Sequence, residues 1–449
     1  MTLLMLSLAG CPASKDAETA ETGAPLDILE ALQAMPGVVD PFEAESKTEG
    51  TRFFVFGFQQ PVDHADPDGP TFTQYVALIH RDEDAPVVLD TRGYANSYAG
   101  TDDELSWMLG ANRINVEHRY FNDSVPADPD WDYMRVSQES DDLHAIVTAL
   151  HGIYAGPWIS TGASKGGETA LYYRAAWPDD VDGTVAYVAP ILQGYPDDVF
   201  GPFFQSVGDA DCRQRLLDLQ RALLSQEDSL IPALDVAASS ALQSFEQVGS
   251  TWAYEVSTAE LAWSFWQYDG DCAALPSPDA PGDELLSWFV DWVGSPYSYS
   301  DLSLAYYSPF FYQSAAELGY PTQPLDGFDD LLHVDPDDLT PLVPTPTLPD
   351  YDGSVVQEDA RKISEEGDRV LLIYGEQDPW SVRALSLDGA TDSHVFTAPG
   401  GNHGSQIADL DAADQAVALE ALSRWTGVDL SATARRGPPP PPEGVRMLP

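Results

Sequence analysis

Short apolar segments alternate with amphipathic ones along much of the chain. Residues 53–58 and 72–79 are strand-like, flank a turn-rich stretch, and are expected to pair antiparallel. Beyond them, short apolar runs predict strands at residues 86–89, 114–116, 158–160, 184–188, 370–374 and 394–397. Residues 141–153 carry apolar side chains at helical spacing, and residues 168–177 predict a helix that ends before Pro178. This alternation predicts an α/β fold, with a mostly parallel sheet covered by helices on both faces.

The alternation stops between residues 190 and 343. Segments rich in Leu, Ala, Trp and Tyr predict helices there, at residues 214–224, 231–243, 258–266 and 284–293. Because the strand pattern resumes at Val370, this helical block is predicted to be an insertion that caps the ends of the strands. We therefore expect a first core segment at residues 41–192, a cap at 193–343 and a second core segment at 344–430.

The two ends of the chain differ in composition from this core. Residues 1–11 form a short apolar run that closes on small residues before Cys11, which matches a bacterial lipoprotein export signal with a lipidated cysteine. A buried apolar segment is the alternative. Polar residues follow at once, so residues 12–40 are expected to be a flexible tether, and the proline-rich residues 431–449 a disordered tail. We therefore expect an exported protein, lipid-anchored to the cell envelope or secreted.

The charge of the chain excludes one class of partner. Lys and Arg number 21 against 73 Asp and Glu, so the formal net charge is −52. Such a chain repels phosphate backbones and anionic headgroups, which excludes nucleic acid and leaves the lipid anchor as the expected contact with a membrane. Apart from Cys11, the cysteines are Cys212 and Cys272. An oxidising compartment favours a disulfide between them, and two unpaired buried cysteines are the alternative.

A Gly-x-Ser-x-Gly motif stands between a predicted strand and a predicted helix, at residues 162–166. A sharp strand-to-helix turn presents the hydroxyl of Ser164 outward, and the flanking glycines let neighbouring backbone approach closely. The amino terminus of the following helix points its dipole at any negative charge that develops near this hydroxyl. Ser164 is therefore the candidate nucleophile.

Two later loops supply candidate partners for this serine. Asp378 follows the strand predicted at 370–374, and His403 lies in the next glycine-rich loop. The chain order Ser, Asp, His is that of α/β-hydrolases, with His403 as the base and Asp378 fixing its tautomer. Glu376 and Asp388 are rival acids, and Asp378 is favoured because it follows the strand by a short turn. The alternatives are a helix cap for Asp378 and a loop histidine bound to backbone for His403.

An oxyanion formed at Ser164 needs two backbone donors. The N–H of Lys165, directly after the nucleophile, is the first. The second normally comes from the loop after an early strand, which here is the segment from Arg92 to Asn96. We favour the N–H of Tyr94, and the alternative is that Gly93 only makes a turn.

Several motifs together resemble one family. The matching segments are residues 160–167, 172–174, 182–190, 374–380 and 401–403. They resemble the bacterial secreted tripeptidyl aminopeptidases of the PS-10 type, which are serine peptidases. Residues 115–121, Asn-Val-Glu-His-Arg-Tyr-Phe, resemble the related lysosomal Pro-Xaa carboxypeptidases and dipeptidyl peptidases. The resemblance extends over residues 53–425.

The resemblance implies an α/β-hydrolase core with a helical cap and an exopeptidase that releases short peptides, expected to be tripeptides, from free amino termini. It implies peptide substrates, no metal and no organic cofactor, and we expect a monomer. One departure stands out, because Gly166-Gly167-Glu168 replaces the family's Gly-Gly-Met. A carboxylate in the first turn suits the helix dipole and is expected to alter the substrate pocket.

An aminopeptidase needs a fixed carboxylate that binds the α-ammonium group of its substrate. Glu117 is our candidate, and an ion pair with His118 or Arg119 that braces its loop is the alternative. Gly93 and Trp380 are further candidates for substrate contact. Two other functions remain open: an esterase or lipase with the same triad, and a lipid-anchored binding protein on a decayed hydrolase scaffold.

Overall fold

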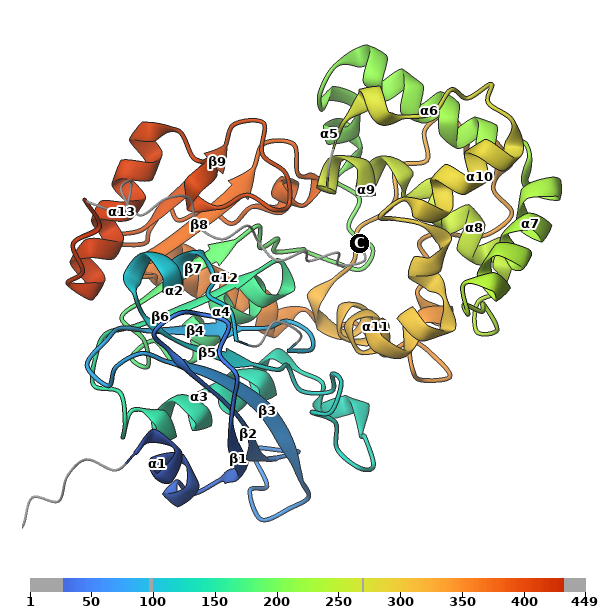
Figure 1. The fold of residues 1–449 in the computed structure, drawn as a ribbon. Helices are drawn as coiled ribbons and strands as arrows, with labels where there is room; N and C mark the ends of the chain where they lie inside the picture. Colours follow the sequence, from blue (N-terminus) through green and yellow to red (C-terminus); the bar gives the residue numbers. More distant parts are fainter. Residues whose placement is uncertain (1–26, 97–99, 269, 432–449) are drawn as a thin grey trace, which may run out of the picture.

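The computed structural model describes residues 27–96, 100–268 and 270–431. Cys11, the first part of the predicted tether and nearly all of the proline-rich tail lie outside the described residues. Among the described residues, nine strands form one sheet in the order β1-β2-β3-β5-β4-β6-β7-β8-β9 (Figure 1). The strands are β1 (Val38–Ala44), β2 (Arg52–Pro61), β3 (Thr71–His80), β4 (Val87–Thr91), β5 (Asn112–Val116), β6 (Trp158–Ala163), β7 (Gly183–Tyr187), β8 (Val370–Gly375) and β9 (His394–Ala398).

The sheet is mostly parallel, as predicted. Strands β1, β2, β3 and β5 pair antiparallel in that order, and the expected β2–β3 pair aligns Phe53 with Ile79 and Phe58 with Gln74. All pairings from β5 through β4, β6, β7 and β8 to β9 are parallel. The carboxyl ends of these strands therefore share one edge of the sheet, which is where ligands bind in open α/β sheets.

Helices cover both faces of the parallel part of the sheet. They are α2 (Glu104–Leu109), α3 (Val136–Leu150), α4 (Lys165–Ala176), α12 (Ser354–Glu366) and α13 (Ala412–Thr426). Helix α1 (Ile28–Ala34) packs beside the antiparallel strands β1 and β2. Helices α2 and α13 pack on Val88, Ile159 and Val185, whereas α3 packs on Val87 and Leu89. Because neighbouring strand residues point to opposite faces, β4 is buried on both sides, and its first three residues, Val87, Val88 and Leu89, form an uninterrupted apolar run.

The expected tether is partly wrong. From residue 27 onward the chain is folded, with helix α1 capped by the Asp27 side chain and strand β1 paired with β2. Ile28 and Leu32 lie one turn apart on α1 and are fully buried in the same cluster as Phe54 and Phe56 of β2. The prediction was wrong because the residues before α1 are polar and only two apolar residues of this short helix, Ile28 and Leu32, are buried.

A block of helices lies between β7 and α12 in the chain and forms a lobe beside the sheet (Figure 1). Its helices are α5 (Gly201–Ser206), α6 (Ala210–Leu224), α7 (Glu227–Ser240), α8 (Ser250–Ala259), α9 (Leu261–Tyr268), α10 (Gly282–Asp291), α11 (Asp301–Gln313) and the π-helical η4 (Ser314–Leu318). Short 3-10 turns complete the described chain: η1 (Trp131–Tyr133), η2 (Cys272–Ala274), η3 (Pro296–Tyr299), η5 (Asp329–Leu331), η6 (Thr340–Leu342), η7 (Pro379–Arg383) and η8 (Ile407–Asp409). Buried residues of the lobe, among them Leu219, Tyr254 and Phe289, form one hydrophobic cluster with Tyr120 and Phe121 of the first core segment. The cap boundaries at residues 193 and 343 stay predictions.

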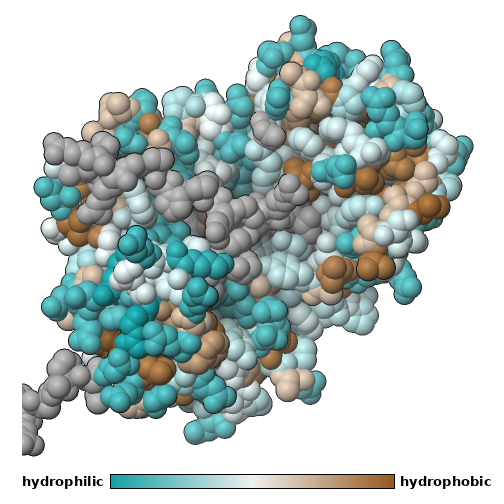
Figure 2. Space-filling view, in the orientation of Figure 1, coloured by the Kyte–Doolittle hydropathy of each residue, from teal (hydrophilic) through white to brown (hydrophobic). Residues whose placement is uncertain are grey.

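The surface agrees with the acidic composition. Figure 2 shows hydrophilic residues spread over this face of the molecule, with smaller hydrophobic areas between them. Among the described residues, no helix combines the length and the apolar character that a bilayer span requires.

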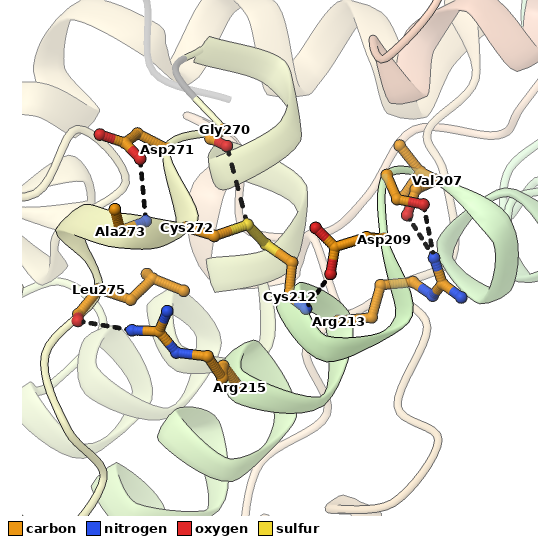
Figure 3. Close-up of a disulfide and its surroundings, with 11 residues drawn as sticks. Val207, Asp209, Cys212, Arg213, Arg215, Gly270, Asp271, Cys272, Ala273 and Leu275 are labelled. Atoms are coloured by element: carbon orange, nitrogen blue, oxygen red, sulfur yellow. Dashed lines mark hydrogen bonds between the residues drawn. A yellow bond between two sulfur atoms is a disulfide. The ribbon is translucent and has the colours of Figure 1, made fainter.

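A disulfide joins Cys212, in the first turn of α6, to Cys272 in η2 (Figure 3). The two cysteines are 60 residues apart in the sequence. Cys212 is buried in the core of the helical lobe, and Leu275, just after η2, accepts a hydrogen bond from Arg215 of α6. The disulfide therefore ties the segment after α9 back onto α6.

We expect the Cys212→Ser/Cys272→Ser variant to lose stability in the helical lobe. A crosslink that closes about 60 residues restricts the unfolded chain, and the entropy model gives about 4 kcal/mol for its loss. Denaturant unfolding of the wild type, with and without reductant, and of the variant measures this effect. Reductant should lower the wild-type midpoint to that of the variant and leave the variant unchanged. Equal midpoints in all four samples would contradict the prediction.

Candidate active site

Ser164 lies on the sharp turn between β6 and α4. Its backbone has φ 56° and ψ −130°, a strained conformation for a residue with a side chain. Ser164 N donates to Tyr187 O of the neighbouring strand, and Ser164 O accepts from Glu168 N of α4. These bonds hold the turn, so that the half-buried hydroxyl projects from the carboxyl edge of the sheet.

The glycines of the motif are needed for close packing of α4. A Cβ on Gly166 would lie 2.5 Å from Thr91 O, at the end of β4. A Cβ on Gly162 would overlap the backbone of Gly166 and Gly167. The Thr91 hydroxyl also donates to Gly166 O at 2.8 Å. Helix α4 can therefore start directly above β4 and β6, which fixes the position of Ser164.

Asp378 and His403 meet Ser164 at this edge. Asp378 follows β8 and His403 follows β9, and both strands run parallel to β6 in the same sheet. His403 Nε2 lies 2.9 Å from Ser164 Oγ, and His403 Nδ1 lies 2.7 Å from Asp378 Oδ2. Asp378 is fully buried and His403 nearly so. This is the geometry in which an imidazole can take the proton of a serine hydroxyl while a carboxylate holds its tautomer.

The rival acids lie elsewhere. Glu376 is exposed and its Oε2 accepts from Gly400 N, and Asp388 is also exposed. Asp378 additionally accepts from Trp380 N through Oδ1, which caps the turn η7. Asp378 therefore has both roles: it caps the turn η7, which was the alternative, and it contacts His403.

The helical lobe positions the histidine loop, a contribution that the sequence did not reveal. His403 N donates to Gln267 O at 2.9 Å, and Asn402 Nδ2 donates to Tyr268 O, both at the end of α9. Trp380 packs edge-on against Trp263 of the same helix, with ring centroids 5.0 Å apart. The lobe and the sheet therefore share the candidate site.

Two backbone N–H groups near Ser164 are predicted to bind an oxyanion. The N–H of Lys165 begins α4, and the N–H of Tyr94 belongs to the loop after β4. Among the described residues, neither N–H has a hydrogen-bond partner. Lys165 Nζ donates to Gly93 O at 2.8 Å, and a Cβ on Gly93 would lie 2.6 Å from Gly166 N. Gly93 thus lets the loop lie against the first turn of α4.

A small cavity of about 20 Å³, partly open to solvent, lies against Ser164. Its lining residues are Tyr94, Ser164, Lys165, Glu168, Pro190, Leu192, Gln267, Phe310, Ser314, Leu318, Gly319, Tyr320 and Trp380. Several of them, including Gln267, Phe310 and Tyr320, belong to the helical lobe or directly follow it. Of the predicted substrate residues, Trp380 lines the cavity, whereas Gly93 and Glu117 do not.

The structure corrects the expectation for Glu117. Its buried carboxylate accepts from Asn96 N at 2.9 Å, Ser124 Oγ at 2.7 Å and Asn122 Nδ2 at 3.3 Å. The alternative, an ion pair with His118 or Arg119, is also absent from the described contacts, because Arg119 pairs with Asp142 and His118 Nδ1 lies 3.7 Å from Glu139 Oε2. Glu117 therefore braces the loop that carries Tyr94. Sequence reasoning had no means of finding its three donors, which come from turns on either side.

The carboxylate that does line the cavity is Glu168, one helical turn after Ser164. Burial raises the pKa of Glu168 to about 8, although the nearby positive charge of Lys165 opposes this rise. Burial likewise lowers the pKa of Lys165 to about 8, against the effect of Glu139, Glu168 and Glu317. The wall of the site therefore combines two buried titratable groups, Glu168 and Lys165, with apolar and aromatic residues such as Leu192 and Phe310.

The fold and the site define an α/β-hydrolase, with a serine at the strand-to-helix turn and an imidazole and a carboxylate beside it. The model of the PS-10 peptidase S37 family matches residues 20–439, and the chain belongs to this family of serine peptidases. It is therefore a serine hydrolase, as predicted.

Several known proteins are similar to the chain. The chain is 37% identical over 428 residues to a prolyl tri/tetrapeptidyl aminopeptidase from Streptomyces mobaraensis, covering 92% of this chain and 88% of the relative. It is 27% identical over 169 residues to the lysosomal Pro-X carboxypeptidase of Mus musculus, covering 32% of this chain and 33% of the relative. A crystal structure of a proline iminopeptidase from Mycobacterium smegmatis aligns with TM-score 0.35 and 16% identity, over 82% of this chain and 96% of that one.

Proposed function

We propose that the chain is a serine exopeptidase that releases short peptides from the free amino termini of oligopeptides, with Ser164, His403 and Asp378 as its catalytic triad. The observation that carries this proposal is the unbroken series of hydrogen bonds from Asp378 through His403 to Ser164, next to a cavity, in a chain of a serine peptidase family. An intact series speaks against a binding protein on a decayed scaffold.

In the first half of the reaction, His403 Nε2 takes the proton of Ser164 as its oxygen attacks the peptide carbonyl. The C–N bond then breaks, the proton passes from His403 to the leaving amine, and the released peptide remains as an ester of Ser164. In the second half, water attacks this acyl-enzyme with His403 again as base, and Ser164 recovers its proton. Asp378 stabilises the imidazolium in both halves through the 2.7 Å contact to Nδ1.

The two backbone N–H groups without partners support an oxyanion hole. The N–H groups of Lys165 and Tyr94 flank the position of the attacked carbonyl oxygen, and the amino end of α4 adds its dipole. Donors of this kind stabilise the charge that develops in the transition state and need no rearrangement when it forms. The hydrogen bond from Lys165 Nζ to Gly93 O supports the required closeness of the two segments.

Access to the site supports an exopeptidase. Residues of the helical lobe, among them Gln267 and Phe310, line the cavity together with Ser164, so the nucleophile is covered on that side. A chain end can enter such a site, whereas the middle of a folded chain cannot. The name of the relative from Streptomyces mobaraensis supports the release of tri- or tetrapeptides.

An esterase or lipase with the same triad is the second candidate. A lipase needs an apolar trough for its acyl chain, and the apolar residues of the lining, such as Leu192 and Phe310, are the feature in its favour. The polar carboxyl group of Glu168 in the same wall disfavours a long acyl chain, because it would lose hydration without gaining a polar partner. The peptidase is the better fit.

Defined substrates test the proposal. We expect the purified chain to cleave Ala-Ala-Xaa p-nitroanilides, with Xaa varied, and to release tripeptides from an oligopeptide that mass spectrometry can follow. Acetylation of the substrate amino terminus should block cleavage, since an exopeptidase of this type reads the free amine. Rapid hydrolysis of p-nitrophenyl butyrate without any anilide cleavage would instead establish the esterase.

We also propose that the protein is exported and lipidated at Cys11. The disulfide between Cys212 and Cys272 supports an oxidising compartment. Labelling of bacteria with radioactive palmitate should mark the wild type and not the Cys11→Ala variant. Equal labelling of the two proteins would refute the anchor.

A further inference from the structure

We propose that the side chain of Lys165 is a positioning group, which orients and polarises the peptide group between Gly93 and Tyr94. The N–H of Tyr94 belongs to this peptide group and is the second predicted oxyanion donor. The inference rests on the proposed function and deepens it. Lys165 then serves the oxyanion twice, once through its own backbone N–H and once through its ammonium group.

The ammonium group of Lys165 is buried against the loop that follows β4. Its Nζ donates to Gly93 O at 2.8 Å, and the residue is 3% exposed. The rings of Tyr94 and Phe121 lie beside it, with centroids 5.7 and 5.5 Å from Nζ. These rings offset part of the cost of burying a cation. The hydrogen bond to Gly93 O fixes where the ammonium group lies.

This ammonium group has no ion pair among the described residues. Three carboxyl groups, those of Glu139, Glu168 and Glu317, act on its charge only at longer range. A buried cation without an ion pair is costly, and an apolar side chain of similar length would avoid that cost. The contact that distinguishes Lys165 from such a side chain is the one to Gly93 O.

Gly93 O and the N–H of Tyr94 are the two ends of one planar peptide group. The cis peptide bond of the described residues joins Tyr195 to Pro196, so this group is trans and its C=O and N–H point in opposite directions. A donor that holds the oxygen therefore also fixes the direction of the N–H. A charged donor in addition polarises the peptide group, which strengthens the hydrogen bond that its N–H gives to an oxyanion.

Other contacts hold the rest of this loop to a different part of the core. Tyr94 O accepts from His118 N at 3.0 Å, and Asn96 N donates to the Glu117 carboxylate at 2.9 Å. Both partners belong to the segment after β5, whereas Lys165 begins α4 directly after the nucleophile. The ammonium group is therefore the contact that ties the second predicted donor to the helix on which the first donor lies.

The Lys165→Met variant removes the ammonium group and keeps both backbone N–H groups and an apolar side chain of similar length. Its substrate is the Ala-Ala-Xaa p-nitroanilide that the wild type cleaves fastest. We expect kcat to fall about tenfold to 10²-fold, less than for the loss of a whole oxyanion donor, because the N–H of Tyr94 remains. KM should stay near the wild-type value, since the ammonium group acts on the transition state.

Gln220→Met is the matched control. Gln220 of α6 is also buried and donates to backbone carbonyls, those of Thr258 and Ala259, but it does not line the cavity. This variant loses buried hydrogen bonds of the same kind and should keep the wild-type kcat.

A pair of inhibitors separates oxyanion positioning from a general loss of structure. In the tripeptide aldehyde that matches the substrate, Ser164 Oγ adds to the carbonyl carbon and forms a hemiacetal, whose former carbonyl oxygen lies where the oxyanion forms. The corresponding tripeptide alcohol has no carbonyl and binds without an adduct. Lys165→Met should raise the Ki of the aldehyde by about the factor by which kcat/KM falls and leave the Ki of the alcohol unchanged.

A near-normal kcat in Lys165→Met overturns the inference, and so does an equal rise of both Ki values. If the variant does not fold, a crystal structure of the wild-type hemiacetal decides: its oxygen is expected within hydrogen-bonding distance of Tyr94 N, with Lys165 Nζ on Gly93 O, and any other position overturns the inference. In all these cases the wild type cleaves peptides and the proposed function stands. If the wild type hydrolyses only p-nitrophenyl esters, the proposed function fails, and the same variant is compared on the ester.

Discussion

The Ser164→Ala variant is expected to cleave peptide anilides about four to six orders of magnitude more slowly than the wild type. Without the hydroxyl, the chain cannot form the acyl-enzyme, although the cavity and the two backbone donors remain. What is left is the modest rate that binding and oxyanion stabilisation supply alone. The His403→Ala variant should lose a comparable amount, because the residues of such a triad act as a unit.

Two measurements check this result. Initial rates on a peptide anilide give the loss of kcat, and a fluorophosphonate probe reports the nucleophile directly. Ser206→Ala is the matched control, because Ser206 is exposed at the end of α5 and donates only to backbone of its own helix. The control should label and turn over like the wild type. Undiminished labelling of Ser164→Ala would remove this residue from the mechanism.

The Asp378→Asn variant is expected to lower kcat about 10⁴-fold at neutral pH with little change in KM. The amide presents an N–H toward His403 Nδ1, which favours the tautomer that carries its proton on Nε2. That nitrogen lies 2.9 Å from Ser164 Oγ in the wild type, and once protonated it cannot accept the serine proton. The amide oxygen can still accept from Trp380 N, so the turn η7 is expected to stay in place.

Glu376→Gln is the control for this prediction. Glu376 lies two residues before Asp378, but it is exposed and its carboxylate contacts Gly400 N. Its variant should keep wild-type kcat within a factor of a few, and circular dichroism should show both variants folded. A large loss in Glu376→Gln together with near-normal Asp378→Asn would transfer the role of the acid to Glu376.

Local sequence was sufficient for the parallel sheet. The runs at residues 86–89, 184–188 and 370–374 are apolar in every position or nearly so, and they correspond to β4, β7 and β8. A strand buried on both faces needs no alternation, so its pattern is visible without knowledge of its partners. The antiparallel pair β2 and β3 was visible for a similar reason, since a turn-rich segment separates two strand-like runs.

Elements whose burial depends on distant contacts were missed. Helix α11 is apolar on most sides, with aromatic residues from Tyr306 to Tyr312, so it lacks the stripe by which a surface helix is recognised. Helix α1 has the opposite problem, because only Ile28 and Leu32 of its seven residues are buried. Both helices are stabilised by packing on segments that are distant in the sequence. A short stretch of sequence around each helix does not show these contacts.

The sequence by itself determined the candidate nucleophile of this protein, Ser164. Only glycine fits at residues 162 and 166, because α4 passes so close to β4 and β6 that a Cβ would collide with backbone. Such a local constraint leaves a motif that can be recognised within one short segment of sequence. The tertiary structure alone decided which carboxyl group lines the cavity beside Ser164. Glu117 is surrounded by donors from two loops, whereas Glu168 lines the cavity without one. The orientation of a buried charge depends on groups from distant parts of the chain, and these meet only on folding.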